Sequence, residues 1–337
     1  MELDRVYFER EALAYPLGRK LYQRFSHDPA VTVTFATSHN RVTGLPGSTP
    51  ARAFAAAKRT LVVGVRRTLD FATCRPSAHY QLPLATGCPG WCRYCYLHTT
   101  LGTRPYMRVY VNVHEILDRA HQYIGERDPD ITVFEGAATS DPVALEALTG
   151  SLGLAVEFFA GEPLGRFRFA TKYDRVENLL ALNHGGHTRV RFSVNWSKII
   201  DHYEHGTPGL ERRLAAAQEV AGAGYPLGFI IAPVFLSPGW EEGYRGLLEE
   251  LGRRFGGVDD LTFEVITHRF TRRAKTNIEA IFPDHGLPMD EESRQFKYGQ
   301  FGYGKFVYPA ASLQLARGRF AGMLQEILPG SRLEYLV

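Results

Sequence analysis

The sequence predicts an α/β protein built around a partial, TIM-like (β/α)6 barrel, with an N-terminal α/β extension and a C-terminal helix plus β-hairpin. Short apolar runs recur along the middle of the chain, and segments of helical period separate them. Strands that alternate with helices in this way form parallel β/α units. Six such units, rather than eight, predict a barrel open on one side. The chain has 337 residues, 45% of them hydrophobic, which suffices for one large α/β domain with a smaller attachment, or for two domains.

Residues 1–78 are expected to form the N-terminal extension. Apolar residues at four-residue spacing predict a short helix over Leu17–Phe25, and an alanine-rich stretch predicts a second helix over Ala51–Lys58. The apolar run Thr60–Val65 predicts a strand. The glycine and proline content of Thr43–Gly47 predicts a loop between the two helices.

Residues 79–268 are expected to form the barrel. The runs that predict its six strands are Tyr80–Ala85, Ile131–Phe134, Phe167–Thr171, Val190–Val194, Leu227–Ala232 and Leu261–Ile266. The helical segments between them are Val113–Ile124, Val143–Phe159, Asp174–Leu182, Gly209–Ala223 and Glu241–Arg254. Because the active site of a β/α barrel lies at the carboxyl ends of its strands, functional residues are expected there.

Residues 269–337 break this alternation. One helix is predicted over Thr271–Phe282, and the glycine- and aromatic-rich stretch after it predicts a β-hairpin. We therefore expect a C-terminal region that lies outside the barrel.

The charge and cysteine content limit the class of protein. The net charge is +3 and the isoelectric point is near 8.6, so a nucleic-acid site would have to be a local basic patch. Four cysteines, three of them within eight residues, do not make a disulfide framework and indicate a reducing compartment. No signal sequence and no run of about 18 apolar residues is present, so a cytoplasmic protein without membrane contact is expected.

Three cysteines in the run Cys-Pro-Gly-Trp-Cys-Arg-Tyr-Cys provide the main chemical signal. Cys88, Cys92 and Cys95 follow the first predicted strand with C-x3-C-x2-C spacing. Three thiolates can each hold one iron of a [4Fe–4S] cube, which leaves the fourth iron open for a substrate or cofactor. The alternative is a zinc site with His98 as the fourth ligand, and the spacing alone leaves it open.

The motif and five longer segments resemble the spore photoproduct lyase family of the radical S-adenosylmethionine superfamily. The segments are Ser77–Cys88, Cys95–Gly102, Arg108–Asn112, Thr267–Thr271 and Gly302–Tyr308. The resemblance implies a [4Fe–4S] cluster and S-adenosyl-L-methionine as cofactors, and a lyase that converts the methylene-bridged thymine dimer in DNA to two thymines. It also implies an electron donor such as ferredoxin or flavodoxin.

The same resemblance implies roles for residues around the cofactors. Cys88, Cys92 and Cys95 match the cluster ligands, while Tyr94, near the adenine, and Tyr96 match a tyrosine pair that relays a hydrogen atom. The residues expected to contact the cofactor besides this pair are Ser140, Lys172, Ser193 and Ala232.

Each of these expectations has an ordinary structural alternative. Tyr94 suits packing, and Ser140 suits a helix cap before Pro142. Lys172 would otherwise be a solvated loop residue. Ser193 and Asn195 share one strand face, so neighbouring strands could satisfy both.

One position departs from the family pattern. The family usually has a cysteine in the loop after the second strand, which returns a hydrogen atom to the product radical, and Ala138 stands there in this chain. Cys74 is the only cysteine outside the cluster motif, so we expect it to be the donor. A lone cysteine is often only a small buried hydrophobic residue, and the sequence cannot place Cys74 near the substrate.

The C-terminal region combines cations with aromatic residues, which suits phosphates and unstacked bases. The residues expected to contact DNA or the lesion are His268, Arg269, Arg272, Lys297, Gln300, Phe301, Tyr303 and Lys305. Gln300 and Phe301 stand where the family commonly has arginine and tyrosine. A solvated helix face is the alternative for the cations near Arg272.

Three functions follow from these observations. The first is a radical S-adenosylmethionine lyase that repairs the spore photoproduct. The second is a radical enzyme of the same fold that acts on another nucleic-acid or small-molecule substrate, which Ala138, Gln300 and Phe301 favour. The third is a nucleic-acid-binding protein with structural zinc.

Overall fold

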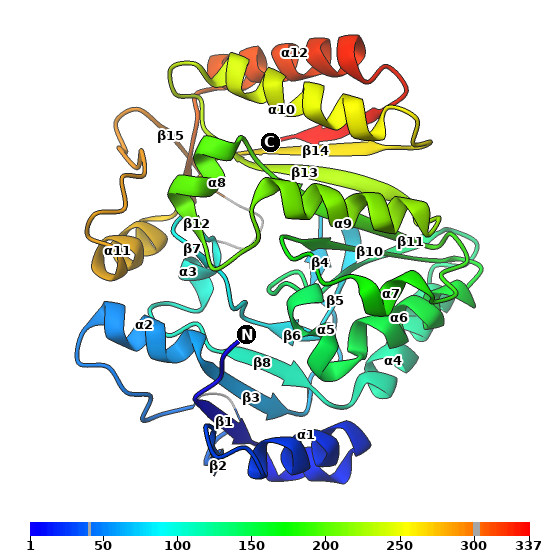
Figure 1. Ribbon diagram of the computed structural model, residues 1–337, viewed down its shortest axis with the longest axis vertical. Coiled ribbons are helices and arrows are strands. Elements are labelled where there is room, and N and C mark those ends of the chain that lie inside the picture. The colour runs from blue at the N-terminus through cyan, green and yellow to red at the C-terminus, as the bar shows by residue number, and fades with distance from the viewer. Residues whose placement is uncertain (40–41, 299–303) are drawn as a thin grey trace.

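The computed structural model describes residues 1–39, 42–298 and 304–337 (Figure 1). The chain forms a mixed α/β fold with two main sheets. The smaller sheet lies below the larger one in Figure 1, and both contribute strands to the region around the cysteine motif.

The smaller sheet has five strands in the order β2–β1–β3–β8–β6. Their bounds are β1 (Arg5–Phe8), β2 (Thr32–Phe35), β3 (Thr60–Gly64), β6 (Ala85–Thr86) and β8 (Met107–Tyr110). Beside them lie η1 (Arg10–Ala14), α1 (Pro16–Ser26) and α2 (Pro50–Lys58), so the predictions for both helices and for β3 are confirmed. Strands β1 and β2 were not predicted, because four residues with mixed polarity give too weak an alternation.

Strand β6 directly precedes the cysteine motif in the chain, and β8 follows it after one short helix. Since β8 pairs with β3, the N-terminal extension and the cysteine segment share one sheet. The extension is thus part of the frame that holds the motif.

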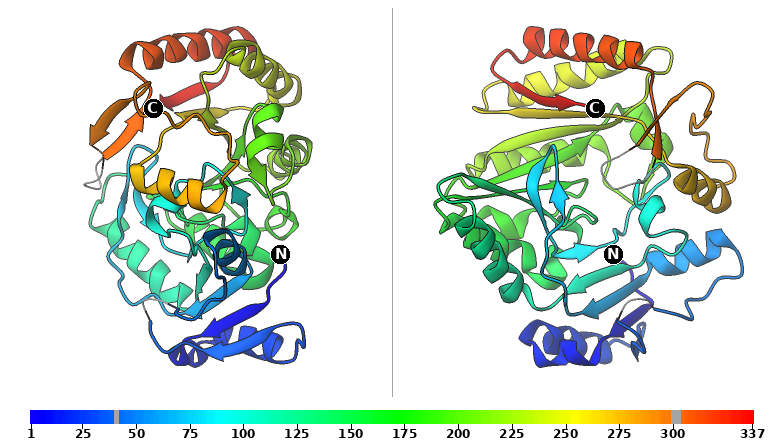
Figure 2. Two further views of the ribbon diagram at one scale, coloured as in Figure 1. Left: turned by 90° about the vertical axis from the view of Figure 1, so that its left-hand side faces the viewer. Right: turned by 180° about the vertical axis from the view of Figure 1, so that it is seen from behind.

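The larger sheet has eight strands in the order β17–β14–β13–β11–β10–β9–β5–β4. Their bounds are β4 (Thr73–Cys74), β5 (Ala78–Leu82), β9 (Thr132–Gly136), β10 (Gly165–Thr171), β11 (Thr188–Val194), β13 (Leu227–Val234), β14 (Thr262–Thr267) and β17 (Arg332–Leu336). All neighbours are parallel except β4 and β5. Figure 2 shows this sheet curled into an open half-barrel.

Each predicted strand run lies in this sheet, with one correction. The run Tyr80–Ala85 is not a single strand: β5 ends at Leu82, and Ala85 belongs to β6 in the smaller sheet. Pro83 lies at the break, where a missing backbone N–H interrupts a ladder. The predicted division of the chain at residues 78 and 268 stays a prediction, although β4 and β17 extend the sheet beyond both.

Helices follow the parallel strands along the chain. They are α4 (Val113–Gly125), α5 (Val143–Thr149), α6 (Ser151–Ala160), α7 (Glu177–Leu180), α8 (Ser197–Tyr203), α9 (Leu210–Gly222) and α10 (Trp240–Phe255). Alternate strand residues such as Phe167, Phe169 and Phe192 join the main core, and none is more than 1% exposed. This core fixes the register of the strands, because a shift by one residue would expose the phenylalanines.

The single helix predicted over Val143–Phe159 is wrong. Helices α5 and α6 are separated at Gly150, whose φ of 66° is favoured by glycine, and the pair bends by 97°. Among the described residues no single helix is long and apolar enough to span a membrane, and only this bent pair has the required length and composition.

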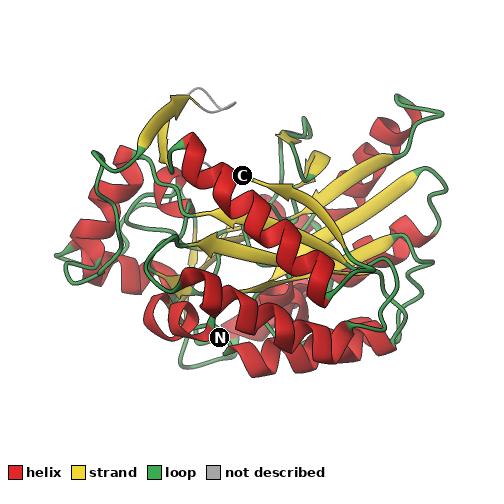
Figure 3. Ribbon diagram, turned by 90° about the horizontal axis from the view of Figure 1, so that it is seen from above, coloured by secondary structure: helices red, strands yellow, loops and turns green. Residues whose placement is uncertain are grey.

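The C-terminal region begins with α11 (Arg272–Ile281), followed by the hairpin of β15 (Gln295–Tyr298) and β16 (Gly304–Val307), as predicted. Helix α12 (Ala310–Ile327) and strand β17 were not predicted. Gly318 and Gly322 weaken the helical signal of α12, because glycine disfavours helix interiors. Helix α12 packs beside α10 (Figure 1, Figure 3), and β17 returns the chain to the larger sheet.

Candidate active site

The predicted site segments gather at the carboxyl edge of the larger sheet. Five strands each deliver one segment there: the cysteine motif follows β5, Ala138 and Ser140 follow β9, Lys172 follows β10, Ala232 lies near the end of β13, and His268 follows β14. Ser193 is the penultimate residue of β11. Parallel strands bring their ends to one edge, so residues distant in sequence become neighbours.

The cysteine motif is folded tightly at this edge. Strand β7 (Trp91–Cys92) pairs with β12 (Glu204–His205), and the short helix α3 (Leu97–Thr100) follows Cys95. The backbone N–H of Gly90 donates to the Sγ of Cys88 at 3.4 Å. Burial raises the pKa of the Cys88 thiol to about 12 and raises the pKa of Cys92 as well, and Cys95 is an electrostatic neighbour of both. The three thiols are therefore close neighbours that ligation must deprotonate.

Three cysteines on one loop give the number and type of protein ligands that a [4Fe–4S] cube with one open iron takes. Within the described ranges, no three His, Cys, Asp or Glu side chains form a group that could hold one metal ion. A tetrahedral zinc site needs its ligands to converge on one point. Cluster ligands need not converge, because each cysteine binds a different iron of the cube.

His98, the fourth ligand of the zinc alternative, lies in an aromatic environment. It is 2% exposed, and its ring stacks on Phe54 at a centroid distance of 5.6 Å, with Phe282 at 6.1 Å. Burial, and then the charge of Lys58, lowers the pKa of His98 to about 4. A neutral, packed ring is the role that these contacts support.

Tyr94 and Lys172 meet at a buried carboxylate that sequence reasoning missed. The Tyr94 hydroxyl donates to Glu204, and Lys172 Nζ donates to Glu204 Oε1 at 2.8 Å and to the Tyr94 hydroxyl at 3.1 Å. Arg213 Nη2 donates to the other Glu204 oxygen at 2.5 Å. Burial raises the pKa of Glu204, but Lys172 and Arg213 outweigh it and the net shift is downward. Lys172 is thus neutralised and only partly exposed, rather than a solvated loop residue.

Tyr96, Ala138 and Cys74 form the second group at this edge. The Tyr96 hydroxyl donates to the backbone carbonyl of Ala138, although Tyr96 is 60% exposed. Although most of the residue is exposed, its hydroxyl end lies among protein atoms, and burial there raises the pKa of Tyr96, with Cys95, Cys74 and Glu135 as electrostatic neighbours. Cys74 is therefore near Tyr96, on the strand that borders β5.

The Cys74 thiol is held in its neutral form. Burial raises the pKa of Cys74 to about 12, and the charge of Glu135 adds to the shift. A thiol that stays protonated keeps its S–H bond, which a thiolate lacks. Cys74 thus has the chemical state that hydrogen-atom donation requires.

Ser140 links the loop after β9 to the cysteine motif. Its hydroxyl donates to the carbonyl of Gly87, and the backbones of the two residues form a β-bridge. The alternative role as a helix cap is wrong, because the side chain that reaches the first turn of α5 is that of Asp141, at 3.4 Å from the Ala144 N–H. Asp141 also accepts the Lys172 N–H at 2.7 Å, and burial raises its pKa to about 6.

Ser193 and Asn195 follow the expected alternation on β11. Phe192 and Val194 are fully buried in the core, and Ser193 is 8% exposed. The Asn195 side-chain amide donates to the Pro233 carbonyl at 2.8 Å. Asn195 therefore ties the end of β11 to the segment that contains Ala232, which leaves Ser193 as the residue of the pair with a cofactor role to propose.

An ionic layer inside the half-barrel lies next to Cys74. Arg191, 1% exposed, donates to Glu264 Oε1 at 2.7 Å and also to Glu135, and Arg168 donates to Glu264. Sequence reasoning missed this layer. The available signal was the alternation of arginine with apolar residues in β10 and β11, which places the arginines on the inner face.

The cations of the C-terminal region divide into two groups. His268 is 2% exposed, and burial and then Arg294 lower its pKa to about 3, so it adds no charge to a phosphate site. Burial lowers the pKa of Lys305, and the charges of Arg269 and Lys297 lower it further, so these three cations are neighbours. Arg272 is exposed and donates to Glu291 at 3.1 Å.

The hairpin presents aromatic side chains beside these cations. Tyr298 is 76% exposed and Phe296 is 45% exposed, with ring centroids 5.3 Å apart. The predicted contacts Gln300, Phe301 and Tyr303 lie outside the described residues.

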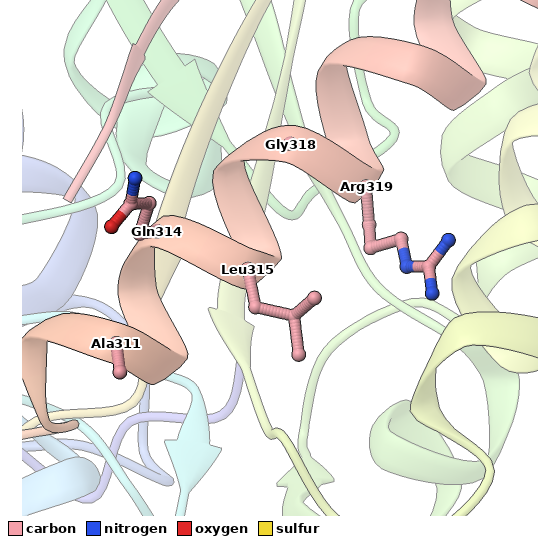
Figure 4. A pocket seen from close by; sticks show the side chains of 5 residues that line it. All are labelled: Ala311, Gln314, Leu315, Gly318 and Arg319. Atoms are coloured by element: carbon pink, nitrogen blue, oxygen red, sulfur yellow. The ribbon is translucent and has the colours of Figure 1, made fainter.

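Hollows in the described part of the chain include two whose lining contains none of the three motif cysteines. One of about 510 Å³ lies along α12 (Figure 4) and contains none of the predicted site residues; it is lined by Ala311, Gln314, Leu315, Gly318 and Arg319. The other, of about 420 Å³, adjoins Cys74 in the chain and is lined by Arg75, Pro76, Ser77, Ala78, His79, Val133 and Arg168.

Comparison with known proteins decides the family. A family model described as spore photoproduct lyase matches residues 1–337. The chain belongs to the spore photoproduct lyase family. A spore photoproduct lyase from Geobacillus sp. (strain Y412MC61) is 50% identical over 332 residues, which cover 98% of this chain and 97% of the relative.

Solved structures of spore photoproduct lyase have the same fold. One, complexed with dinucleoside spore photoproduct, matches with a TM-score of 0.96 and 49% identity over 99% of both chains. Another is a variant with one cysteine changed to alanine and one serine changed to cysteine, with bound AdoMet and dinucleoside spore photoproduct. It matches with a TM-score of 0.96 and 50% identity over 99% of both chains.

Proposed function

We propose that this chain is a radical S-adenosylmethionine lyase that converts the spore photoproduct in DNA to two thymines. The observation that carries the proposal is the full-length match to the spore photoproduct lyase family, combined with three neighbouring cysteines on the loop after β5. We further propose that the six parallel strands β5, β9, β10, β11, β13 and β14 with their helices act as a partial (β/α)6 barrel around the cofactors.

The cofactor residues follow from the edge of the larger sheet. A [4Fe–4S] cluster held by the three cysteines, together with AdoMet, would supply a 5′-deoxyadenosyl radical for removal of a hydrogen atom from C6 of the lesion. Cys88, Cys92 and Cys95 are the proposed iron ligands. The other proposed cofactor contacts are Tyr94, Tyr96, Ser140, Lys172, Ser193 and Ala232.

Lys172 is suited to bind the cofactor carboxylate, because an ion pair already offsets the free-energy cost of burying its ammonium group. Glu204 neutralises it at 2.8 Å, so a second carboxylate shares an ammonium that the fold holds in place. The remaining Glu204 oxygen keeps its partner Arg213. Lys172 can therefore bind the carboxylate without leaving Glu204 unpaired.

Cys74 is the proposed hydrogen-atom donor. It lies near Tyr96, and its S–H bond is intact at neutral pH because burial raises the pKa of the thiol. The solved double variant gives independent support. Its two substituted positions are as far apart along its chain as Cys74 and Ala138 are along this one, with cysteine first and alanine second in both.

Donation would move a hydrogen atom from Cys74 Sγ to the carbon radical of the product and leave the radical on sulfur. Tyr96 and Tyr94 are the proposed path by which a hydrogen atom from the cofactor's deoxyadenosine returns to Sγ. At present the two hydroxyls donate to Ala138 and Glu204, respectively. During turnover, each hydroxyl would have to leave its present acceptor and take another one on the path.

The hairpin and the residues beside it are the proposed DNA contact. Lys297 and Lys305 lie directly opposite each other in the β15–β16 register, and two like charges in that position repel. Phosphate would relieve this repulsion, and Phe296 and Tyr298 offer flat surfaces for unstacked bases. The other residues of the proposed DNA contact are Arg269, Arg272, Gln300, Phe301 and Tyr303. His268, whose ring is buried, is included in the proposed contact.

Two further parts of the proposal concern the environment of the enzyme. A ferredoxin or flavodoxin is the proposed electron donor, since the cluster must be reduced before AdoMet is cleaved. The cytoplasm is the proposed location, in keeping with cysteines that serve a cluster rather than disulfides.

The decisive experiment is anaerobic turnover of the iron-reconstituted protein with a synthetic dinucleotide spore photoproduct, AdoMet and dithionite, followed by mass spectrometry. Formation of the repaired thymine dinucleotide is expected. Cleavage of AdoMet without repair would favour the second candidate, an enzyme of this fold with another substrate. Ala138 is the residue that favours this candidate. A colourless protein that binds zinc and cleaves no AdoMet would refute both.

A further inference from the structure

The last residue of α2 places a buried ammonium group against the cysteine motif. Lys58 is 5% exposed, and its Nζ donates to the backbone carbonyl of Cys88 at 2.6 Å. The same ammonium lies 5.2 Å from the centroid of the Phe54 ring. Among the described residues no carboxylate forms an ion pair with it. A buried cation without a counter-ion is costly, so its location requires an explanation.

The surroundings indicate that the charge of Lys58 acts on the motif. Its 2.6 Å contact with the Cys88 carbonyl holds the ammonium against the backbone of a proposed iron ligand. The Phe54 ring, 5.2 Å from the same ammonium, stacks on His98, three residues after Cys95. The ammonium is therefore a positive charge held directly beside the first cysteine.

Aromatic side chains keep solvent away from this contact. The ring of Phe54 lies between Trp91, His98 and Phe282, with centroid distances of 5.3, 5.6 and 5.2 Å. Phe54 itself is 1% exposed. In a dry environment of this kind a charge interacts more strongly than it does in water.

We propose that Lys58 sets the reduction potential of the cluster by placing a fixed positive charge beside its Cys88 ligand. Reduction adds one negative charge to the cluster, and a nearby cation stabilises the reduced form more than the oxidised form. The N-terminal extension would thus have a second role besides framing the motif: it would make the cluster easier to reduce. The inference rests on the proposed function only in requiring that the motif binds a cluster.

The sharpest test is the midpoint potential of the reconstituted cluster, measured by redox titration with electron paramagnetic resonance. Lys58→Met removes the charge, Lys58→Gln removes it but keeps a hydrogen-bond donor for the Cys88 carbonyl, and Lys58→Arg keeps it. Both neutral variants are expected to have a more negative potential than the wild type, and the arginine variant a potential near that of the wild type.

A matched control comes from the same helix. Arg52 is an exposed cation near the beginning of α2, where water screens its charge, so Arg52→Met is expected to leave the potential unchanged. Iron content is measured in every variant, because a merely structural role would reduce the amount of cluster without shifting its potential.

The proposal is overturned if fully loaded Lys58→Met and Lys58→Gln proteins have the wild-type potential. Failure of both neutral variants to take up iron would also overturn it, since Lys58 would then be an assembly residue. A wild-type chain that binds no cluster would refute the proposed function as well. A wild-type cluster that cleaves AdoMet without repairing the lesion would refute only the proposed function, and the potential of the variants would still decide the role of Lys58.

Discussion

The hydroxyl of Tyr96 donates a hydrogen bond to the backbone carbonyl of Ala138. A backbone carbonyl is present whatever the side chain, so the alanine at this position does not remove the acceptor that holds Tyr96. The tyrosine can therefore remain in place if the hydrogen-atom donor is, as proposed, Cys74 on β4, the strand that borders β5. The first prediction tests this proposed donor.

Replacing Cys74 by alanine is expected to lower clean repair at least tenfold and to produce radical by-products, because no other S–H group is available to the product radical. Cleavage of AdoMet should continue, since Cys74 is not a proposed cluster ligand. Mass spectrometry of products from the dinucleotide lesion measures both. The double variant Cys74→Ala, Ala138→Cys supplies the matched control and should restore repair; clean repair by Cys74→Ala alone would contradict the assignment.

The Cys74 thiol is expected to resist alkylation at pH 8 in the holoenzyme, where iron protects the other three cysteines. Its pKa of about 12, against an ordinary 9.0, leaves roughly a thousandfold less thiolate than a free cysteine has, and thiolate is the reactive form. The raised pKa favours the neutral thiol, so the rate should climb with pH well beyond 9. Iodoacetamide labelling followed by peptide mass spectrometry measures it. Rapid labelling at pH 8 in the folded protein, equal to that in guanidinium chloride, would contradict this prediction.

Changing Glu204 to glutamine is expected to destabilise the fold by about 3–5 kcal/mol, because it leaves the buried Arg213 and Lys172 without a counter-charge. Urea unfolding at pH 7 measures the loss. Glu211→Gln, which breaks an exposed pair with Arg254, is the control and should leave the stability nearly unchanged.

The stability difference between wild type and Glu204→Gln is also expected to depend on pH. Folding lowers the pKa of Glu204 below its ordinary 4.5, so the stability that its charge provides is present above that pH and lost as the pH falls through the folded pKa. The difference between wild type and Glu204→Gln should therefore narrow below pH 4.5. A constant difference from pH 7 to pH 3.5 would show that charge is not the cause.

Replacing Tyr298 by alanine is expected to weaken binding of lesion-containing DNA by about 1–3 kcal/mol, because its exposed ring would otherwise stack on a base. Lys297→Ala should instead reduce the slope of log affinity against log salt concentration by about one. Fluorescence anisotropy measures both. Ile131→Ala is the control, since Ile131 is 47% exposed at the amino end of β9, away from the hairpin. Equal affinity of Tyr298→Ala and wild type would remove the hairpin from the proposed contact.

Hydrophobic periodicity was sufficient for the long elements of this fold. Strands such as β11 and helices such as α9 have apolar spacings that only one secondary structure satisfies, and both were predicted to within one or two residues. Elements whose pattern is short or interrupted were missed, among them β1, β8 and α12. The bend between α5 and α6 was also missed, because a glycine inside an apolar run does not reveal whether the helix continues.

By itself the sequence determined the α/β class, the strands that carry the site and the three cysteines that point to a cluster, because those features depend on local pattern and on side-chain chemistry. Tertiary structure alone decided which distant charges meet. Glu204 joins Lys172 and Arg213, Arg191 joins Glu135 and Glu264, and Lys58 of α2 reaches the Cys88 carbonyl. Such pairs depend on how the chain returns to the same edge, and no local pattern records that path, because the free energy of a buried charge is set by partners from other segments.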